Sequence, residues 1–167
     1  MSLLAVNGSP STTSKTRAVA EAAVQLAGGR VLDVSSLDAD ALLLRGSHPG
    51  VGDALAALAA ADRIVLCTPV YRATYSGLLK VLLDLLPPEG LAGAGVVLAA
   101  TAGSPAHFLA LDTGLRPVVA SVGGWCVPTV VYATGSDFDG DGRPSPEVVA
   151  TLASALDEAG RVATRPA

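Results

Sequence analysis

The chain has 167 residues, of which half are hydrophobic and 16% are charged, and its formal net charge is −4. This length suits a single domain over residues 1–167 with a sizeable core, and the apolar balance excludes a disordered chain. Without a basic cluster, the sequence lacks the electrostatic signature of a nucleic-acid-binding protein. So low a charged fraction also favours a surface partly covered by a second subunit.

The two cysteines, Cys67 and Cys126, stand alone in apolar stretches rather than in a CxxC pair. They lack the spacing of zinc or dithiol sites. We expect buried, reduced thiols and a reducing, cytoplasmic compartment. Residues 117–136 carry no charge, but prolines and glycines interrupt them, so we expect a helix end, a turn and a strand rather than a membrane span. The first residues show no signal-peptide pattern.

Short apolar runs alternate with longer helical segments along the chain. We expect strands at residues 3–7, 30–34, 63–68, 95–101 and 125–132. We expect helices at residues 14–27, 53–61, 76–86, 107–122 (kinked or restarted at Pro117) and 146–159, with a loop region at 36–51. This repeated β-α order predicts a parallel α/β sheet with helices on both faces. Ligands of such sheets bind beyond the carboxyl ends of the strands, so the loops after the first, third and fourth strands are candidate sites.

The loop after the first strand, residues 8–17, is rich in hydroxyl side chains and leads into a helix. Lys15 and Arg17 at the helix start oppose its dipole unless an anion lies between them, which favours a bound phosphate. A Ser/Thr-rich turn with an ordinary N-cap is the alternative. The Walker A pattern fails because Ser14 replaces its second glycine, and the GxGxxG fingerprint is absent. Asp33, after the second strand, is then more simply a turn residue than a ribose-binding acid.

The loops after the third and fourth strands carry the most specific motifs. The chain reads Thr-Pro-Val-Tyr at residues 68–71, Tyr-Ser-Gly-Leu-Leu-Lys at 75–80, and Thr-Ala-Gly-Ser-Pro-Ala-His at 101–107. Together with Gly-Ser-Pro at residues 8–10, these motifs resemble those of the NADPH-dependent FMN reductase family, above all the small reductases of alkanesulfonate use. The matches run from Leu3 to about Pro117.

This resemblance implies a flavodoxin-like three-layer sandwich with five parallel strands in the order 2-1-3-4-5. It implies hydride transfer from NADPH or NADH to flavin mononucleotide (FMN), with reduced flavin supplied to a partner monooxygenase. The flavin carries such chemistry, so we expect no catalytic acid–base pair and no metal. The residues that the resemblance assigns to FMN binding are Ser9, Ser11, Ser14, Thr16 and Arg17 in the first loop, Pro69, Val70, Tyr71 and Arg72 in the second, and Thr101, Gly103, Ser104 and His107 in the third.

Two of these residues have alternative roles. Tyr71 is a candidate wall of the flavin site, but it could instead pack half-buried beside Tyr75. His107 could contact the flavin or substrate, cap a helix, or lie in a subunit interface. Tyr71 and His107 are the candidate contributors to catalysis.

Three positions depart from the family pattern. Ser11 stands where an arginine is often found, so that Lys15 or Arg17 would replace its charge. Ala102 replaces a glycine, which predicts a slightly different loop if the backbone there needs a positive φ. Thr113 stands where the sulfonate-linked reductases carry an extra aromatic residue or histidine, so the chain could hold FMN differently from them.

Two other activities stay open. One is an FMN-dependent quinone or azo reductase that keeps its flavin tightly bound. The other is a flavodoxin-type electron carrier, although the mild net charge and the nearby Arg72 and Lys80 argue against it.

The helix expected at residues 76–86 is apolar almost all round, which predicts burial on all sides. Its charged residues Lys80 and Asp84 stand four apart, where they can pair or bridge subunits. The resemblance implies a homodimer packed on this helix, or a tetramer made by doubling it. Residues 137–142 look like the start of an EF-hand loop, but Glu147 falls one position early, so we expect a surface turn.

Overall fold

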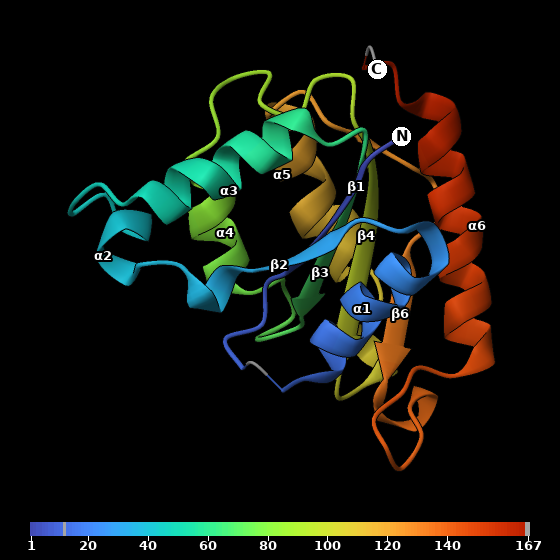
Figure 1. The fold of residues 1–167 in the computed structure, drawn as a ribbon. Helices are drawn as coiled ribbons and strands as arrows, with labels where there is room; N and C mark the ends of the chain where they lie inside the picture. Colours follow the sequence, from blue (N-terminus) through green and yellow to red (C-terminus); the bar gives the residue numbers. More distant parts are fainter. Residues whose placement is uncertain (12, 166–167) are drawn as a thin grey trace.

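The computed structural model describes residues 1–11 and 13–165. Within these residues, six parallel strands form one sheet in the order β2-β1-β3-β4-β5, with β6 also beside β4 (Figure 1). The strands are β1 (Leu3–Asn7), β2 (Arg30–Asp33), β3 (Arg63–Pro69), β4 (Gly95–Ala102), β5 (Trp125–Cys126) and β6 (Val131–Thr134). This confirms the expected α/β fold and the strand order 2-1-3-4-5.

Helices cover both faces of this sheet (Figure 1). α1 (Lys15–Ala27) and α6 (Pro146–Val162) pack on one face, where alanines allow a close approach to the strands. The helices on the other face are α2 (Ala39–Leu42), α3 (Pro49–Ala60), α4 (Gly77–Asp84) and α5 (Arg116–Ser121). The central strands β3 and β4 are buried on both faces, which explains their continuous apolar sequence.

Serine N-caps fix the starts of three of the helices that were expected from sequence. Ser14 accepts from the Arg17 amide, Ser76 from the Leu79 amide, and Ser145 from the Val148 amide. Such a cap satisfies an amide that has no partner within its helix.

Two segments differ from the sequence expectation because side chains redirect the backbone. The single fifth strand is divided into β5 and β6, since Pro128 has no amide hydrogen and Thr129 donates to Glu158 instead of the sheet. The expected loop at 36–51 begins at the last residue of the 3-10 turn η1 (Val34–Ser36) and contains α2 and the first residues of α3. Asp38 caps α2 and His48 caps α3, whose first residue is a proline.

The segment expected as one kinked helix at 107–122 is assembled from three parts. These are the 3-10 turn η2 (Pro105–His107), a π-helical turn η3 (Leu111–Leu115) and α5. The expected restart at Pro117 is confirmed, because α5 begins one residue earlier with Pro117 in its first turn.

Candidate active site

The three candidate loops meet at the carboxyl end of the sheet, because β1, β3 and β4 are neighbours. Direct hydrogen bonds join them. The Val70 amide donates to the Thr101 carbonyl at 2.8 Å, and the Thr16 and Thr101 hydroxyls lie 2.6 Å apart. Ser76 donates its hydroxyl to the Gly8 carbonyl at 2.6 Å. The expected site residues of the three loops therefore belong to one connected region.

The first loop is held in shape by its own polar side chains. The Ser9 amide donates to Asn7 Oδ1 at 3.2 Å, and the Ser11 amide donates to Ser9 Oγ at 3.2 Å. Ser14 Oγ accepts from the Arg17 amide at 3.1 Å. In these bonds the Ser9 and Ser14 hydroxyls are acceptors, which leaves each a hydrogen to donate to an anion. The loop thus offers hydroxyl donors beside a helix N-terminus, a chemistry that fits a phosphate.

Not all of the predicted phosphate ligands lie on the surface of this loop. Thr16 is buried, and its hydroxyl is engaged by Thr101. Ser9 is also buried, whereas Ser11 is exposed and donates its hydroxyl to the Thr13 carbonyl at 3.0 Å. Thr12 lies outside the described residues.

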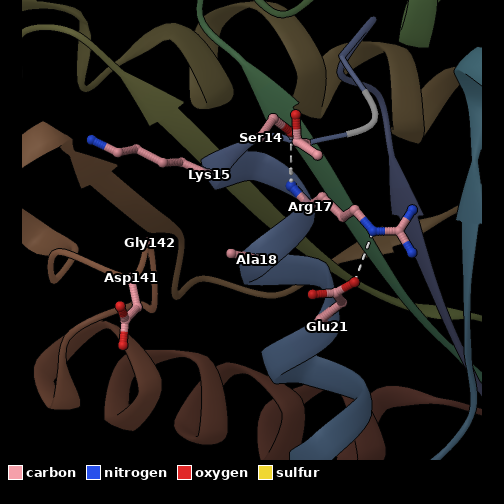
Figure 2. A pocket seen from close by; sticks show the side chains of 8 residues that line it. Ser14, Lys15, Arg17, Ala18, Glu21, Asp141 and Gly142 are labelled. Carbon is pink, nitrogen blue, oxygen red and sulfur yellow. Dashed lines mark hydrogen bonds and ion pairs between the residues drawn. The ribbon is translucent and has the colours of Figure 1, made fainter.

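The two cations at the start of α1 point to opposite sides of the helix (Figure 2). Lys15 Nζ donates to the Gly135 carbonyl at 3.2 Å and lies 5.2 Å from the centre of the Phe138 ring. Arg17 instead forms ion pairs with Glu21, at 2.7 Å, and with Asp33. Hydrogen bonds to Glu21 and then Asp33 raise the pKa of the Arg17 guanidinium. Arg17, which the sequence assigned to the flavin phosphate, thus has two carboxylate partners in this structure.

A cavity of about 420 Å³ opens beside α1, between this helix and the segment around Asp141 (Figure 2). The eight residues lining it include Thr13 and Ser14 at the end of the first loop. None of its lining residues belongs to the second or third loop, so the cavity lies beside the first loop alone. The EF-hand-like segment on its far side is a turn, as expected. There Asp139 Oδ1 accepts from the amides of Asp141 and Arg143, at 2.9 and 2.8 Å.

The second loop makes a tight turn over the end of β3. Tyr71 and Thr74 exchange two backbone hydrogen bonds, of 2.9 and 3.2 Å. Between them, Arg72 and Ala73 adopt φ angles of 51° and 64°, a left-handed conformation that costs energy in non-glycine residues. Tyr71 is 52% exposed and stands clear of the core, while Tyr75 is half-buried and packs against it. Packing therefore accounts for Tyr75 but not for Tyr71.

The third loop begins without the backbone strain that the sequence suggested. β4 continues through Ala102, whose φ is not positive, so alanine is accommodated there. Ser104 caps the turn η2 by accepting from the Ala106 amide, and His107 ends that turn in an exposed position. The Tyr132 hydroxyl donates to the Ser104 carbonyl at 2.7 Å and so ties the loop to β6.

Sequence reasoning missed three residues that shape the site. Asn7 is fully buried at the end of β1 and donates to Asp33 Oδ1 at 2.8 Å, and Tyr132 holds the third loop. A polar residue at the end of an apolar strand was the available signal for Asn7. Asp33, taken from sequence as a turn residue, links Asn7 to Arg17.

Two features outside the loops also bear on function. Thr113 lies exposed in the π-helical turn and donates its hydroxyl to the Leu109 carbonyl at 2.9 Å. On α4, Lys80 and Asp84 pair within the helix, as expected. The same helix is not buried all round in the single chain, because Leu78, Val81 and Leu85 stay partly exposed.

The part of the chain that the structure describes contains no group of three or more His, Cys, Asp or Glu residues able to hold a metal ion. In that same part, no helix has both the length and the apolar character needed to cross a membrane. Both cysteines are free, Cys67 buried and Cys126 half-buried.

Comparison with known proteins agrees with the geometry of the loops. Residues 1–139 match the family model described as NADPH-dependent FMN reductase. An FMN reductase (NADPH) of Escherichia coli K12 is 33% identical over 165 residues, which cover 95% of this chain and 86% of the relative. The NADH-dependent FMN reductase SfnF of Pseudomonas fluorescens Pf0-1 is 45% identical over 84 residues, or 50% of this chain and 45% of that protein.

A solved structure described as the apo form of an NADH:FMN oxidoreductase, EMOB, superposes with a TM-score of 0.86. It is 37% identical, and the match covers 99% of this chain and 91% of that one. An oxidoreductase from Corynebacterium diphtheriae gives a TM-score of 0.80 at 34% identity, with 100% and 99% of the two chains covered. The chain belongs to the NADPH-dependent FMN reductase family.

Proposed function

We propose that this enzyme binds FMN across the three loops and supplies reduced flavin to a partner monooxygenase. Its family membership makes it an oxidoreductase that uses NADPH or NADH and FMN. The observation that carries the proposed site is the set of hydrogen bonds that joins the first, second and third loops at one end of the sheet.

In this proposal the chain's residues bind and orient, while bound FMN supplies the capacity to accept a hydride. Ser9 and Ser14 donate hydroxyl hydrogens to the phosphate, and Ser11 joins them once its hydroxyl turns away from the Thr13 carbonyl. Thr16 holds the loop in place through its hydrogen bond with Thr101. Pro69, Val70 and Tyr71 line the ring on one side, with Arg72 at its edge. On the other side stand Thr101, Gly103, Ser104 and His107. Hydride transfer depends on close stacking of two rings, so these residues act by positioning.

We also propose that the partly exposed side of α4 is covered by a second copy of the chain. Leu78, Val81 and Leu85 follow one another at helical spacing on this side. Tyr71 in the second loop and Phe108, the residue just after the third loop, are 52% and 58% exposed. A homodimer, or a tetramer built from two dimers, would bury this apolar surface. The free thiols support a reducing, cytoplasmic location.

The activity is tested with the purified protein by following oxidation of NADPH and of NADH, with and without added FMN. We expect oxidation that depends on free FMN and reduced flavin that a separate acceptor can consume. A protein that purifies with tightly bound FMN and turns over quinones without added flavin would instead be the quinone or azo reductase. If it binds FMN but oxidises neither nicotinamide, the electron carrier is supported.

The subunit contact is tested by light scattering of Val81→Glu. We expect the wild type to be a dimer or tetramer and the variant to dissociate, since a charge would be buried in the interface. Ser154→Glu, at an exposed position on α6, is the matched control and should leave the assembly unchanged. A monomeric wild type would contradict this part of the proposal.

A further inference from the structure

Charge around the first loop is arranged against tight binding of an anion. Arg17, one of the two cations in the first turn of α1, stands between two carboxylates, those of Glu21 and Asp33. One guanidinium shared by two carboxylates leaves this group net negative. Lys15 lies on the opposite side of α1 (Figure 2). Its ammonium group donates to the Gly135 carbonyl and lies over the Phe138 ring. The donors that remain for a phosphate are neutral hydroxyls and backbone amides.

Asp33 occupies a particular place in this arrangement. Its Oδ1 accepts from Asn7, which precedes the first loop, and its Oδ2 pairs with Arg17, the last residue of that loop. Asn7 in turn accepts from the Ser9 amide, so the carboxylate is connected to both ends of the loop. The pair is only partly exposed, with 33% of the Arg17 side chain and 19% of the Asp33 side chain accessible. Solvent therefore screens it less than a fully exposed ion pair.

We propose that Asp33 is a positioning residue that holds Arg17 away from the flavin phosphate and thereby keeps FMN binding weak enough for release. This inference rests on the proposed function, because it concerns the phosphate of FMN in the first loop. Arg17 lies three residues after the N-cap Ser14, so its long side chain can reach the same helix end once the pair is broken. A guanidinium–phosphate contact is stronger than one from a neutral hydroxyl.

The test compares the affinities of FMN and riboflavin in wild type and Asp33→Asn, measured by quenching of flavin fluorescence. The asparagine oxygen can still accept from Asn7, but its amide group cannot pair with Arg17. We expect the Kd of FMN to fall by about three- to tenfold and the Kd of riboflavin, which lacks the phosphate, to stay within about twofold of wild type. A merely structural role of Asp33 would change both flavins alike or weaken both.

Three further variants assign the effect to Arg17. In the double variant Asp33→Asn/Arg17→Gln the gain should disappear, since the freed cation is gone. Glu21→Gln is the matched control, because it removes a carboxylate from Arg17 but leaves Asp33 in place, and it should not tighten FMN binding by more than about twofold. Should Asp33→Asn fail to fold by circular dichroism, Asp33→Ser provides a second uncharged side chain for the same comparison.

Salt gives an independent measurement. FMN binding to Asp33→Asn should weaken more steeply with NaCl than binding to the wild type, because it gains a cation–phosphate contact. An unchanged or weaker FMN affinity in the uncharged variants overturns the inference while leaving the reductase intact, since wild-type NAD(P)H oxidation is measured separately. A wild type that neither binds FMN nor oxidises NAD(P)H overturns both.

Discussion

The first and second loops flank the same end of the sheet but hold their shapes in opposite ways. The first loop is fixed by side chains that bond to its backbone from both ends, among them Asn7, Ser14 and Ser76. The second turns through Arg72 and Ala73, which both adopt left-handed backbone angles. One loop is thus stabilised by satisfied polar groups, and the other stores backbone strain.

This difference predicts whether a substitution in each loop lowers or raises the stability of the fold. Changes that remove or crowd the bonds of the first loop should destabilise the fold and weaken flavin binding together. Changes that relieve the backbone strain of the second loop should stabilise the fold. They can do so at the expense of activity if the strained backbone is what places this loop against the flavin ring.

The largest effect is expected at Gly8 in the first loop. A Cβ there would lie 2.8 Å from the Leu79 Cβ and 3.1 Å from the Cys67 carbonyl oxygen, both in packed elements. Gly8→Ala should therefore lower the free energy of unfolding by about 2–3 kcal/mol, measured by urea denaturation. Gly103→Ala is the control, because a Cβ there meets nothing within 4 Å and should change stability little. Equal losses in the two variants would contradict the comparison.

Ser76 connects the two loops and is expected to have the next largest effect. Its hydroxyl donates to the Gly8 carbonyl and also caps α4, and its amide donates to Thr68 Oγ1 at 2.9 Å. Ser76→Ala leaves a buried carbonyl and a helix amide without partners, at a cost of about 2 kcal/mol. Urea denaturation measures the loss, and FMN titration should show weaker binding.

Ser145→Ala separates these two roles of Ser76. It removes the cap of α6 without touching the loops and should cost about 1 kcal/mol with unchanged FMN affinity. Identical FMN affinities of Ser76→Ala and the wild type would show that the bond to Gly8 does not shape the site.

In the second loop, by contrast, we expect a substitution that raises the free energy of unfolding. Ala73→Gly removes the steric cost of a left-handed alanine and should raise the free energy of unfolding by about 1 kcal/mol. Ala102→Gly in β4, where φ is not positive, is the matched control and should lower it by about 0.5–1 kcal/mol. Urea denaturation of both variants measures the two changes. A loss of stability in both would refute stored strain at Ala73.

Sequence patterns were sufficient for the layout of the fold because each pattern had a local cause. Continuous apolar runs predicted the doubly covered strands. Helical composition predicted helix starts at residues 14, 76 and 146, within a residue of the observed starts of α1, α4 and α6. Prediction failed where a distant partner decided the structure. The carboxylate of Glu158, for example, takes the hydrogen bonds of Thr129 and interrupts the fifth strand.

The same distinction applies to the site. The motifs in three loops identified which segments meet, because the carboxyl ends of adjacent parallel strands converge. They did not reveal how charges pair across elements: Asp33 is 16 residues from Arg17 in sequence, and nothing local marks them as partners. Nor did they indicate Tyr132, which bonds to a carbonyl 28 residues away.

Tyr132 gives the smallest expected effect and extends the comparison to the third loop, which is held by one side chain from β6. Tyr132→Phe removes the hydrogen bond to the Ser104 carbonyl and should cost about 0.5–1 kcal/mol of unfolding free energy. Because burial raises the pKa of the Tyr132 hydroxyl, the folded state favours the neutral, donating form.

The contribution of this bond is therefore fully present below the pKa of an unfolded tyrosine, about 10, and is lost as the pH rises through the higher pKa of the folded state. The difference in unfolding free energy between wild type and Tyr132→Phe should be constant from pH 6 to 9, on the order of the single bond, and shrink above that range. Subtracting the variant removes every contribution to the pH dependence that the two proteins share. A difference that grew with pH would mean that the ionised hydroxyl, rather than the neutral donor, holds the third loop.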